Sequence, residues 1–180
     1  MFFCLLLTEH KIGPRQVELY TLENPVFQMY LFVVAVSVAK MMYQNLLASI
    51  RMVVSGTGMQ SPEDLRPGLL NPDPKLSQLS AGDYVDRPRR ILQTDLEVNP
   101  AFWVVGLGFV AVNPPLLFAE ILFVGFFVFR AGHWWTYERA MGLGYRALFF
   151  FPSVLIIITM ALTVVVGVVQ AMTVSDLHGD

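Results

Sequence analysis

The stretch DRPRRILQTDLEVNPAFWVVG, residues 86–106, decides the fold because it joins a dense run of charge to an apolar segment. Three arginines and three carboxylates stand directly before a run of Phe, Trp, Val and Gly that is typical of a membrane interior. A helix needs about 20 mostly apolar residues to cross the hydrocarbon core, and this apolar run alone is shorter than that. A helix that crosses here must therefore begin inside the charged half, near Pro88.

The whole chain has the composition of a membrane protein. Hydrophobic residues make up 55% of its 180 residues, charged residues 14%, and the mean hydropathy is +0.56. A water-soluble domain of this size needs more polar groups for its surface. The net charge of -2 gives no indication of a nucleic-acid partner, and no Cys/His spacing predicts a metal site. A single cysteine, Cys4, excludes an internal disulfide.

Four apolar segments predict an all-α membrane protein, a single domain over residues 1–180 built as a bundle of four transmembrane helices. Asn24 and Pro25 form a helix start before the first segment, and Asn113-Pro114-Pro115 forms a turn after the second. The run 2–7 is too short for a span, so we expect a terminus that lies on the membrane surface or frays. The predicted spans are residues 26–50, 88–112, 116–137 and 147–172.

Basic residues predict the orientation of these spans. They gather in the connection between the first two spans, residues 51–87, and around the link between the last two, whereas the turn 113–115 and the C-terminal tail have none. The positive-inside rule therefore places both basic connections in the cytosol and both termini on the other side. Within the long cytosolic loop, Ser61-Pro62-Glu63-Asp64 has the pattern of a short helix start.

Helical spacing gathers polar residues on two faces near the cytosolic end. Arg90, Gln93, Thr94 and Glu97 share one face of the second span, and Arg130, His133 and Tyr137 share one face of the third, with Arg146 beginning the fourth at the same level. Charges that face lipid cost several kcal/mol, so we expect these faces to meet each other or a neighbouring subunit around water or an anionic ligand.

Several of these residues also have a purely structural interpretation. Intramembrane Arg and Glu can pair only to fix helix packing, and Lys40 is interpreted as a structural residue whose ammonium group is held by a partner helix. His133 taken alone is more typical of a packing or interfacial residue than of a catalyst. Trp134 and Trp135 have the pattern of an interfacial aromatic belt.

Four motifs in order resemble one family of membrane proteins. VDRPRRILQTDLE fits V-E-R-x-R-R-A-H-x-N-D-L-E, with Asp86 in place of Glu, and SPEDL upstream resembles N-P-E-D. Downstream, RAGHWWTY fits R-x-x-H-x-x-x-Y and YRALFFF fits R-A-L-x-F-F. With the first-helix segment NPVFQMYLFVVAVSVAKMM, the chain resembles the MAPEG superfamily, membrane-associated proteins in eicosanoid and glutathione metabolism, in the branch of microsomal glutathione transferase and microsomal prostaglandin E synthase.

The resemblance implies a homotrimer of four-helix bundles in the endoplasmic reticulum membrane or the mitochondrial outer membrane, with glutathione bound between adjacent subunits near the cytosolic face. Guanidinium groups suit the two carboxylates of glutathione, and Glu97 suits its ammonium group. Arg146 is implied as the catalytic residue that favours the thiolate. The implied glutathione site consists of Arg51, Arg90, Gln93, Thr94, Glu97, Arg130, His133, Tyr137 and Arg146.

Three functions remain open on this resemblance. The first is a glutathione transferase and peroxidase that acts on hydrophobic electrophiles or lipid hydroperoxides. The second is a prostaglandin E synthase-like isomerase, against which Ala147 counts, because the synthase has Ser there. The third is a non-catalytic lipid-binding scaffold like the five-lipoxygenase-activating protein, favoured by Leu92 and Thr94 where the branch has His and Asn, and by Gln93 where the prostaglandin synthase has Arg.

Overall fold

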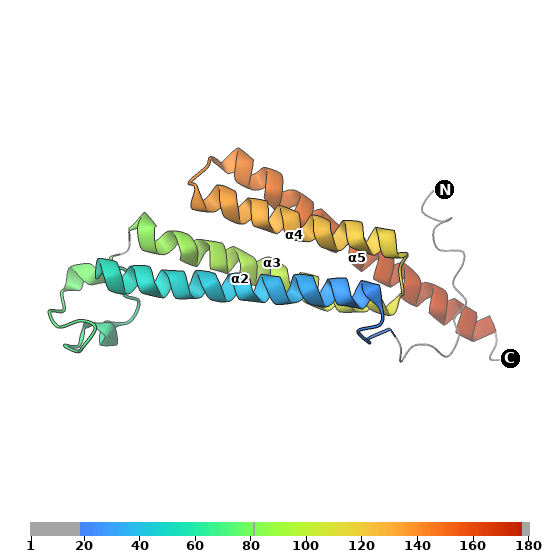
Figure 1. The fold of residues 1–180 in the computed structure, drawn as a ribbon, viewed down its shortest axis with the longest axis horizontal. Helices are drawn as coiled ribbons and strands as arrows, with labels where there is room; N and C mark the ends of the chain where they lie inside the picture. Colours follow the sequence, from blue (N-terminus) through green and yellow to red (C-terminus); the bar gives the residue numbers. More distant parts are fainter. Residues whose placement is uncertain (1–18, 81, 178–180) are drawn as a thin grey trace.

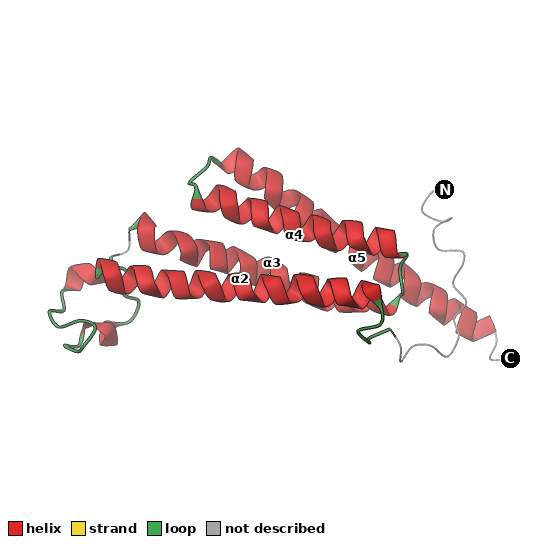
Figure 2. Ribbon diagram, viewed as in Figure 1, coloured by secondary structure: helices red, strands yellow, loops and turns green. Residues whose placement is uncertain are grey.

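The computed structural model describes residues 19–80 and 82–177 as a bundle of long helices. In this part of the chain the long helices are α2 (Pro25–Ser55), α3 (Asp83–Ala111), α4 (Leu116–Glu138) and α5 (Leu143–Leu177), with short 3₁₀ helices η2 (Pro62–Leu65) and η3 (Leu76–Leu79) between α2 and α3. The η2–η3 loop and the α4–α5 turn lie at one end of the bundle, and the α3–α4 turn lies at the other (Figures 1 and 2). The predicted all-α fold is confirmed.

The predicted helix start at Asn24 and Pro25 is confirmed. The Asn24 side-chain oxygen accepts a hydrogen bond from the backbone N–H of Val26 at 3.0 Å, and Pro25 takes the first helical position, where its missing N–H costs nothing. At the other end α2 stops at Gly56, whose φ of 61° is the left-handed conformation that glycine adopts without strain. The turn after α3 contains Asn113 with φ 48°, a conformation that asparagine tolerates better than most residues.

The connection between α2 and α3 is shorter than the predicted loop 51–87, because α2 continues to Ser55 and α3 already begins at Asp83. The predicted helix start at Ser61 forms a single 3₁₀ turn, in which the backbone N–H of Ser61 donates to Asp64 Oδ2 at 3.1 Å. Asn71 is buried and joins the two short helices, since its side-chain N–H groups donate to Asp64 O at 3.1 Å and Gln78 Oε1 at 2.9 Å. The loop is therefore an ordered cap on the end of the bundle.

The core lies between α2, α3 and α4 and is aromatic. Phe102 of α3 stacks on Phe126 of α4 with ring centroids 3.8 Å apart and planes 3° apart. Tyr30 of α2 packs near Phe102, with ring centroids 6.4 Å apart, and donates its hydroxyl to Trp103 O at 2.8 Å. The Tyr30 ring lies so close to Gly106 that a Cβ there would come within 2.7 Å of it. Close packing across a small residue is what holds membrane helices together, because lipid is as apolar as their side chains.

Three of the four long helices, α2, α4 and α5, are long and apolar enough to cross a membrane within the described residues. α3, which contains the predicted span 88–112, has sufficient length at 29 residues but does not reach that hydropathy. The reason is its first half, in which arginines and carboxylates alternate with apolar residues. The helices also extend past the predicted spans, most clearly at α5, which begins at Leu143 rather than residue 147.

α5 leaves most of its apolar surface uncovered in the single chain. Only 11% of the residues in its most apolar 18-residue stretch are buried, against 33% in the corresponding stretch of α4. Such a surface requires lipid or another protein chain around it. The predicted terminal segment 2–7, with Cys4, lies outside the described residues.

Candidate functional site

The predicted polar face of α3 points away from the helices of the same chain. Arg90, Gln93 and Glu97 are exposed and Thr94 is half-buried. Thr94 Oγ1 donates to the backbone oxygen of Arg90 at 3.0 Å, and Gln93 Nε2 donates to Glu97 Oε1 at 3.4 Å. The helical spacing thus predicts correctly that these side chains share one face.

Arg90 is held toward the beginning of α3 by a carboxylate of its own helix. Its Nη2 lies 2.6 Å from Asp83 Oδ1, two turns earlier. The hydrogen bond from Arg90 lowers the pKa of the Asp83 carboxyl below its ordinary value, and the positive charge of Arg90 adds to the effect. Both side chains are solvent-exposed, so the pair is weak and can be exchanged for another anion.

His133, Tyr137 and Arg146 form a second group, between α4 and α5. The His133 ring is buried and lies 5.7 Å from the Tyr137 ring and 5.9 Å from the Phe150 ring, measured between centroids. The Arg146 guanidinium lies over the Tyr137 ring, 4.7 Å from its centroid. His133 Nδ1 and Arg146 Nε are buried and have no hydrogen-bond partner among the described residues. Of the residues expected to gather here, the structure brings His133, Tyr137 and Arg146 together.

Tyr137 connects this second group to the polar face of α3. It lies close enough to Arg90 for the two side chains to interact electrostatically. Tyr137 lies in the last turn of α4 and Arg146 in the first turn of α5, so both flank the α4–α5 turn, which lies at the same end of the bundle as the η2–η3 loop (Figure 1). We refer to Arg90, Tyr137 and Arg146 as one corner of the bundle.

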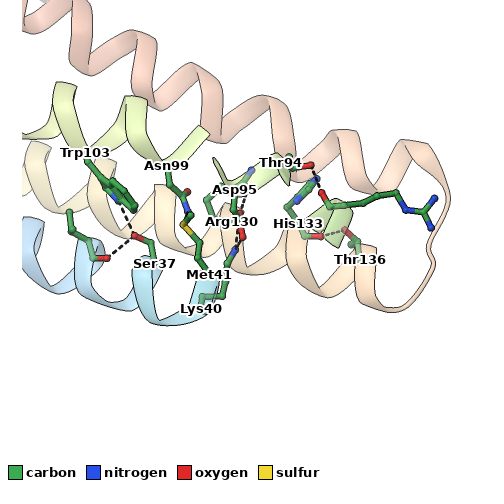
Figure 3. Close-up of polar contacts among 12 residues, drawn as sticks. Ser37, Lys40, Met41, Thr94, Asp95, Asn99, Trp103, Arg130, His133 and Thr136 are labelled. Carbon is green, nitrogen blue, oxygen red and sulfur yellow. Dashed lines mark hydrogen bonds and ion pairs between the residues drawn. The ribbon is translucent and has the colours of Figure 1, made fainter. Parts of the chain in front are cut away.

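Arg130 lies in a different environment from the one that its helical face predicts. It points into the bundle, where its Nη2 donates to Asp95 Oδ1. Lys40 of α2 approaches the same carboxylate, with Nζ 3.0 Å from Oδ1 and 2.9 Å from Oδ2 (Figure 3). Asp95 follows Thr94 directly, and one helical residue turns the side chain by about 100°, so Asp95 faces inward while Thr94 faces out. The polar face of α3 that carries Arg90 therefore does not meet the Arg130 side chain of α4.

Asp95, the carboxylate shared by Lys40 and Arg130, is not predicted from the sequence as a residue of the site. Its side chain is completely buried between two cations. The signal for it is present in the sequence, because Ile91, Asp95, Val98 and Phe102 have the spacing of one buried face. An acid on that face is the natural partner for a lysine in the neighbouring span. The expectation that a partner helix holds the Lys40 ammonium group agrees with its contact with Asp95 of α3.

Arg51 lies at the end of the bundle, apart from the other arginines of the predicted site. Its Nη2 is 2.5 Å from Glu138 Oε1, and its Nη1 donates to Tyr84 O at 3.1 Å. Arg87 donates to the backbone oxygen of Glu138 at 3.1 Å. These contacts tie the ends of α2, α3 and α4 together, so Arg51 has an ion-pair partner within its own chain.

Together these features define an all-α membrane protein that collects arginine side chains from α2, α3 and α5 at one end of the bundle and buries an ionic cluster at mid-helix. The MAPEG family model matches residues 26–166, so the chain belongs to the MAPEG family. The match spans α2, α3, α4 and most of α5. In the comparison with curated proteins, no protein matches the chain. Family membership indicates a glutathione-related or eicosanoid-related function at the membrane, in a family that includes glutathione transferases and other enzymes.

Proposed function

We propose that the chain is a membrane glutathione transferase and peroxidase. The observation that carries this proposal is the outward face of α3, on which Arg90, Gln93 and Glu97 are exposed and Thr94 is half-buried in the described part of the chain. Charged side chains that face lipid cost several kcal/mol, so this face requires a polar ligand, a neighbouring subunit or both. Glutathione between subunits satisfies that requirement, in line with the MAPEG membership.

The side chains of this corner suit the groups of the tripeptide. The Arg90 guanidinium is exposed and exchanges Asp83 for a glutathione carboxylate at little cost. Glu97 carries an exposed carboxylate for the glutathione ammonium group. Gln93 and Thr94 between them supply hydrogen bonds to the peptide backbone of the ligand. In this proposal Arg51, Arg130 and His133 contribute to the electrostatics around the ligand rather than form its primary contacts.

Arg146 is the residue proposed to activate the thiol. It occupies the first turn of α5, where its own charge adds to the positive end of the helix dipole. Both favour a thiolate over a thiol, whose reference pKa is about 8.5. The thiolate sulfur attacks the electrophilic carbon, a thioether forms, and the leaving group departs with its electron pair. In the peroxidase reaction two glutathione molecules form a disulfide, while the hydroperoxide is reduced to an alcohol and water.

The assembly in this proposal is a homotrimer in the endoplasmic reticulum membrane, with the active site near the cytosolic face and both termini luminal. The exposed apolar surface of α5 and the exposed polar face of α3 support contact with other chains, because neither surface is covered within one described protomer. An apolar electrophile reaches such an interface through the bilayer.

A second candidate function is a non-catalytic, lipid-binding member of the same family. The observation that favours it is the pairing of three arginines of the predicted glutathione site with carboxylates of their own chain: Arg51 with Glu138, Arg90 with Asp83 and Arg130 with Asp95. Thr94 also uses its hydroxyl proton on the α3 backbone, where the branch has an asparagine. A scaffold needs these pairs only to hold its helices in place.

The experiment that separates the two candidates measures glutathione chemistry in the detergent-purified protein. We expect thiolate absorbance on addition of glutathione, and conjugation of a chloronitrobenzene above the uncatalysed rate. Arg146→Ala should lose both signals while the oligomer persists in size-exclusion chromatography. Prostaglandin endoperoxide turnover is measured in parallel, since it would support the isomerase instead.

The matched control is Arg139→Ala. Arg139 caps the end of α4, just before the turn that leads to Arg146, is exposed, and stacks on the Trp135 ring at 4.5 Å from its centroid. Its replacement should leave the thiolate signal and the conjugation rate unchanged. If the unmodified protein shows neither thiolate absorbance nor conjugation above the uncatalysed rate, the transferase proposal is rejected and the scaffold is favoured.

A further inference from the structure

A pocket inside one protomer stands apart from the polar face of α3. It lies between α2, α3 and α4 and has a volume of about 210 Å³. Apolar side chains of Val33, Val36, Phe126 and Phe127 line it, and Phe127 is exposed on the apolar outer surface of α4. The opening therefore faces the region that lipid occupies around a membrane helix.

Side chains of the buried ionic cluster form one wall of this pocket, although the surface that faces the cavity is almost entirely apolar. Lys40 and Arg130 both line the pocket and share the single carboxylate of Asp95, so these three side chains carry a net charge of +1. Two cations around one carboxylate leave one positive charge without a counter-ion within the cluster. In a membrane interior such a charge requires an anion, because no bulk water solvates it.

Hydrogen-bond donors in the same wall lack acceptors. The Arg130 side chain is only 4% exposed. Its Nε and Nη1 are buried and have no partner among the described residues. Trp134 also lines the pocket, and its Nε1 is buried and likewise unpartnered in the described part of the chain. Asn99 Oδ1 is an unpartnered acceptor beside them. Buried donors without acceptors are costly, and a carboxylate offers several acceptor positions at once.

The depth of the cluster restricts the class of anion. Lys40 lies midway along α2 (Pro25–Ser55), about 22 Å from either end of the helix at 1.5 Å per residue. A phospholipid head group stays at the bilayer surface, whereas a small carboxyl group on a single chain can enter with its apolar tail. The charged wall of the pocket suits the carboxyl group of such a molecule, and the apolar lining suits its tail.

We propose that this pocket binds the carboxyl end of a long-chain fatty acid. The carboxylate accepts hydrogen bonds from Arg130 and from the N–H donors of Lys40 and Trp134, and the first part of the chain packs along Val33, Phe126 and Phe127. The rest of the chain leaves through the opening into the bilayer. The site is formed by one protomer and is independent of the proposed glutathione chemistry.

The test uses fluorescence quenching in nanodiscs of unbrominated lipid. The Trp135→Phe protein keeps Trp134, which lines the pocket, and Trp103, which donates to the pocket residue Ser37 at 3.1 Å. A stearic acid brominated in the first half of its chain should quench their emission in a saturable manner. The methyl ester of the same acid should bind about tenfold more weakly or show only linear partitioning, because it lacks the charge.

Two kinds of variant check the location of the site. Lys40→Met leaves Asp95 neutralised by Arg130 and removes the excess charge, so saturable quenching should be lost, whereas Lys40→Arg should retain it. If Lys40→Met does not assemble, Val36→Phe fills the apolar part of the pocket without adding a fluorescent tryptophan and should abolish binding of the acid. Equal quenching by acid and ester, or saturable quenching that survives both Lys40→Met and Val36→Phe, would overturn the proposal.

Millimolar glutathione distinguishes this site from the proposed active site. It should not displace the brominated acid, since the two ligands occupy different faces of α3. Displacement of the acid would assign the pocket to glutathione and overturn the separate fatty-acid site. A protein that binds the acid but shows no conjugation would leave this inference standing while the transferase proposal fails.

Discussion

Lys40 of α2 and Asp95 of α3 form a buried ion pair in which the lysine ammonium lies 3.0 Å and 2.9 Å from the two carboxylate oxygens. Arg130 of α4 contacts the same carboxylate, so a single acidic side chain joins three helices at mid-depth (Figure 3). An ionic contact of this kind fixes which faces of the helices meet, because any other rotation would leave a charge in lipid. It therefore determines which residues of α3 remain facing outward.

Removal of the shared carboxylate should destabilise the bundle strongly. In Asp95→Asn two buried cations lose their common counter-ion, and breaking a buried ion pair from one side costs about 3–5 kcal/mol. We expect a large drop in the thermal unfolding temperature in detergent. The control is Asp86→Asn on the same helix, whose carboxylate is 38% exposed and 3.6 Å from Arg89, and which should change the stability by less than about 1 kcal/mol. Equal stability of the two variants would contradict the role assigned to Asp95.

Gly132 should be intolerant of a side chain, because α4 and α5 approach closely there. A Cβ at this position would come within 2.3 Å of the Phe149 ring of α5. Gly132→Ala should therefore push the start of α5 outward at a cost of about 1–3 kcal/mol and displace Arg146, which lies one turn before Phe149. Both the unfolding temperature and the conjugation rate should fall.

Gly142→Ala is the control for this effect. No described atom outside its immediate chain neighbours lies within 4 Å of a Cβ at Gly142, which belongs to the α4–α5 connection. Its unfolding temperature should match that of the unmodified protein. Comparable losses in both variants would mean that the helix contact at Gly132 is not the cause.

The fold is largely predictable from the sequence, whereas the orientation of the helices is not. Asn24-Pro25 and Asn113-Pro114-Pro115 are local signals, since capping and left-handed turns depend on neighbouring residues alone. The spacing of Arg90, Thr94 and Glu97 likewise gives their common face. The same helical spacing assigns Arg130 to one face of α4. It does not indicate whether that face meets Asp95 or Arg90, because the neighbour of Arg130 depends on how three helices pack. For the same reason Asp95 escapes notice among charged neighbours.

Release of Arg90 from its own carboxylate should strengthen glutathione binding. Asp83→Asn removes the hydrogen-bond acceptor that holds Arg90 at 2.6 Å. Because the pair is exposed and weak, we expect the KM for glutathione to fall by about fivefold at most, with kcat unchanged. The control is Asp73→Asn, which breaks a pair with Lys75 in the η2–η3 loop and should leave the KM unchanged. An increased KM in Asp83→Asn would show that Asp83 assists glutathione binding rather than competes with glutathione for Arg90.

The pH dependence of this pair follows from the lowered pKa of Asp83. Its folded-state pKa lies below the ordinary value of 3.8, so the carboxylate stays ionised and paired throughout the neutral and mildly acidic range. Its contribution to stability is present above the ordinary aspartate pKa and is lost as the pH falls through the lowered value. The difference in KM between Asp83→Asn and the unmodified protein should therefore be constant from neutral pH down to mildly acidic pH.

In our proposal, an asparagine at position 94, as in the branch that the sequence resembles, should also tighten glutathione binding. Thr94 uses its hydroxyl proton on Arg90 O at 3.0 Å, so only its oxygen remains available to a ligand on the outward face. An asparagine there reaches further and offers both donors and an acceptor, so Thr94→Asn should lower the KM for glutathione several-fold. Thr94→Val keeps the shape but removes the hydroxyl, and it should raise the KM or leave it unchanged. If both variants behave like the unmodified protein in glutathione titrations, this face of α3 does not contact glutathione, and the ligand must be sought elsewhere in the bundle.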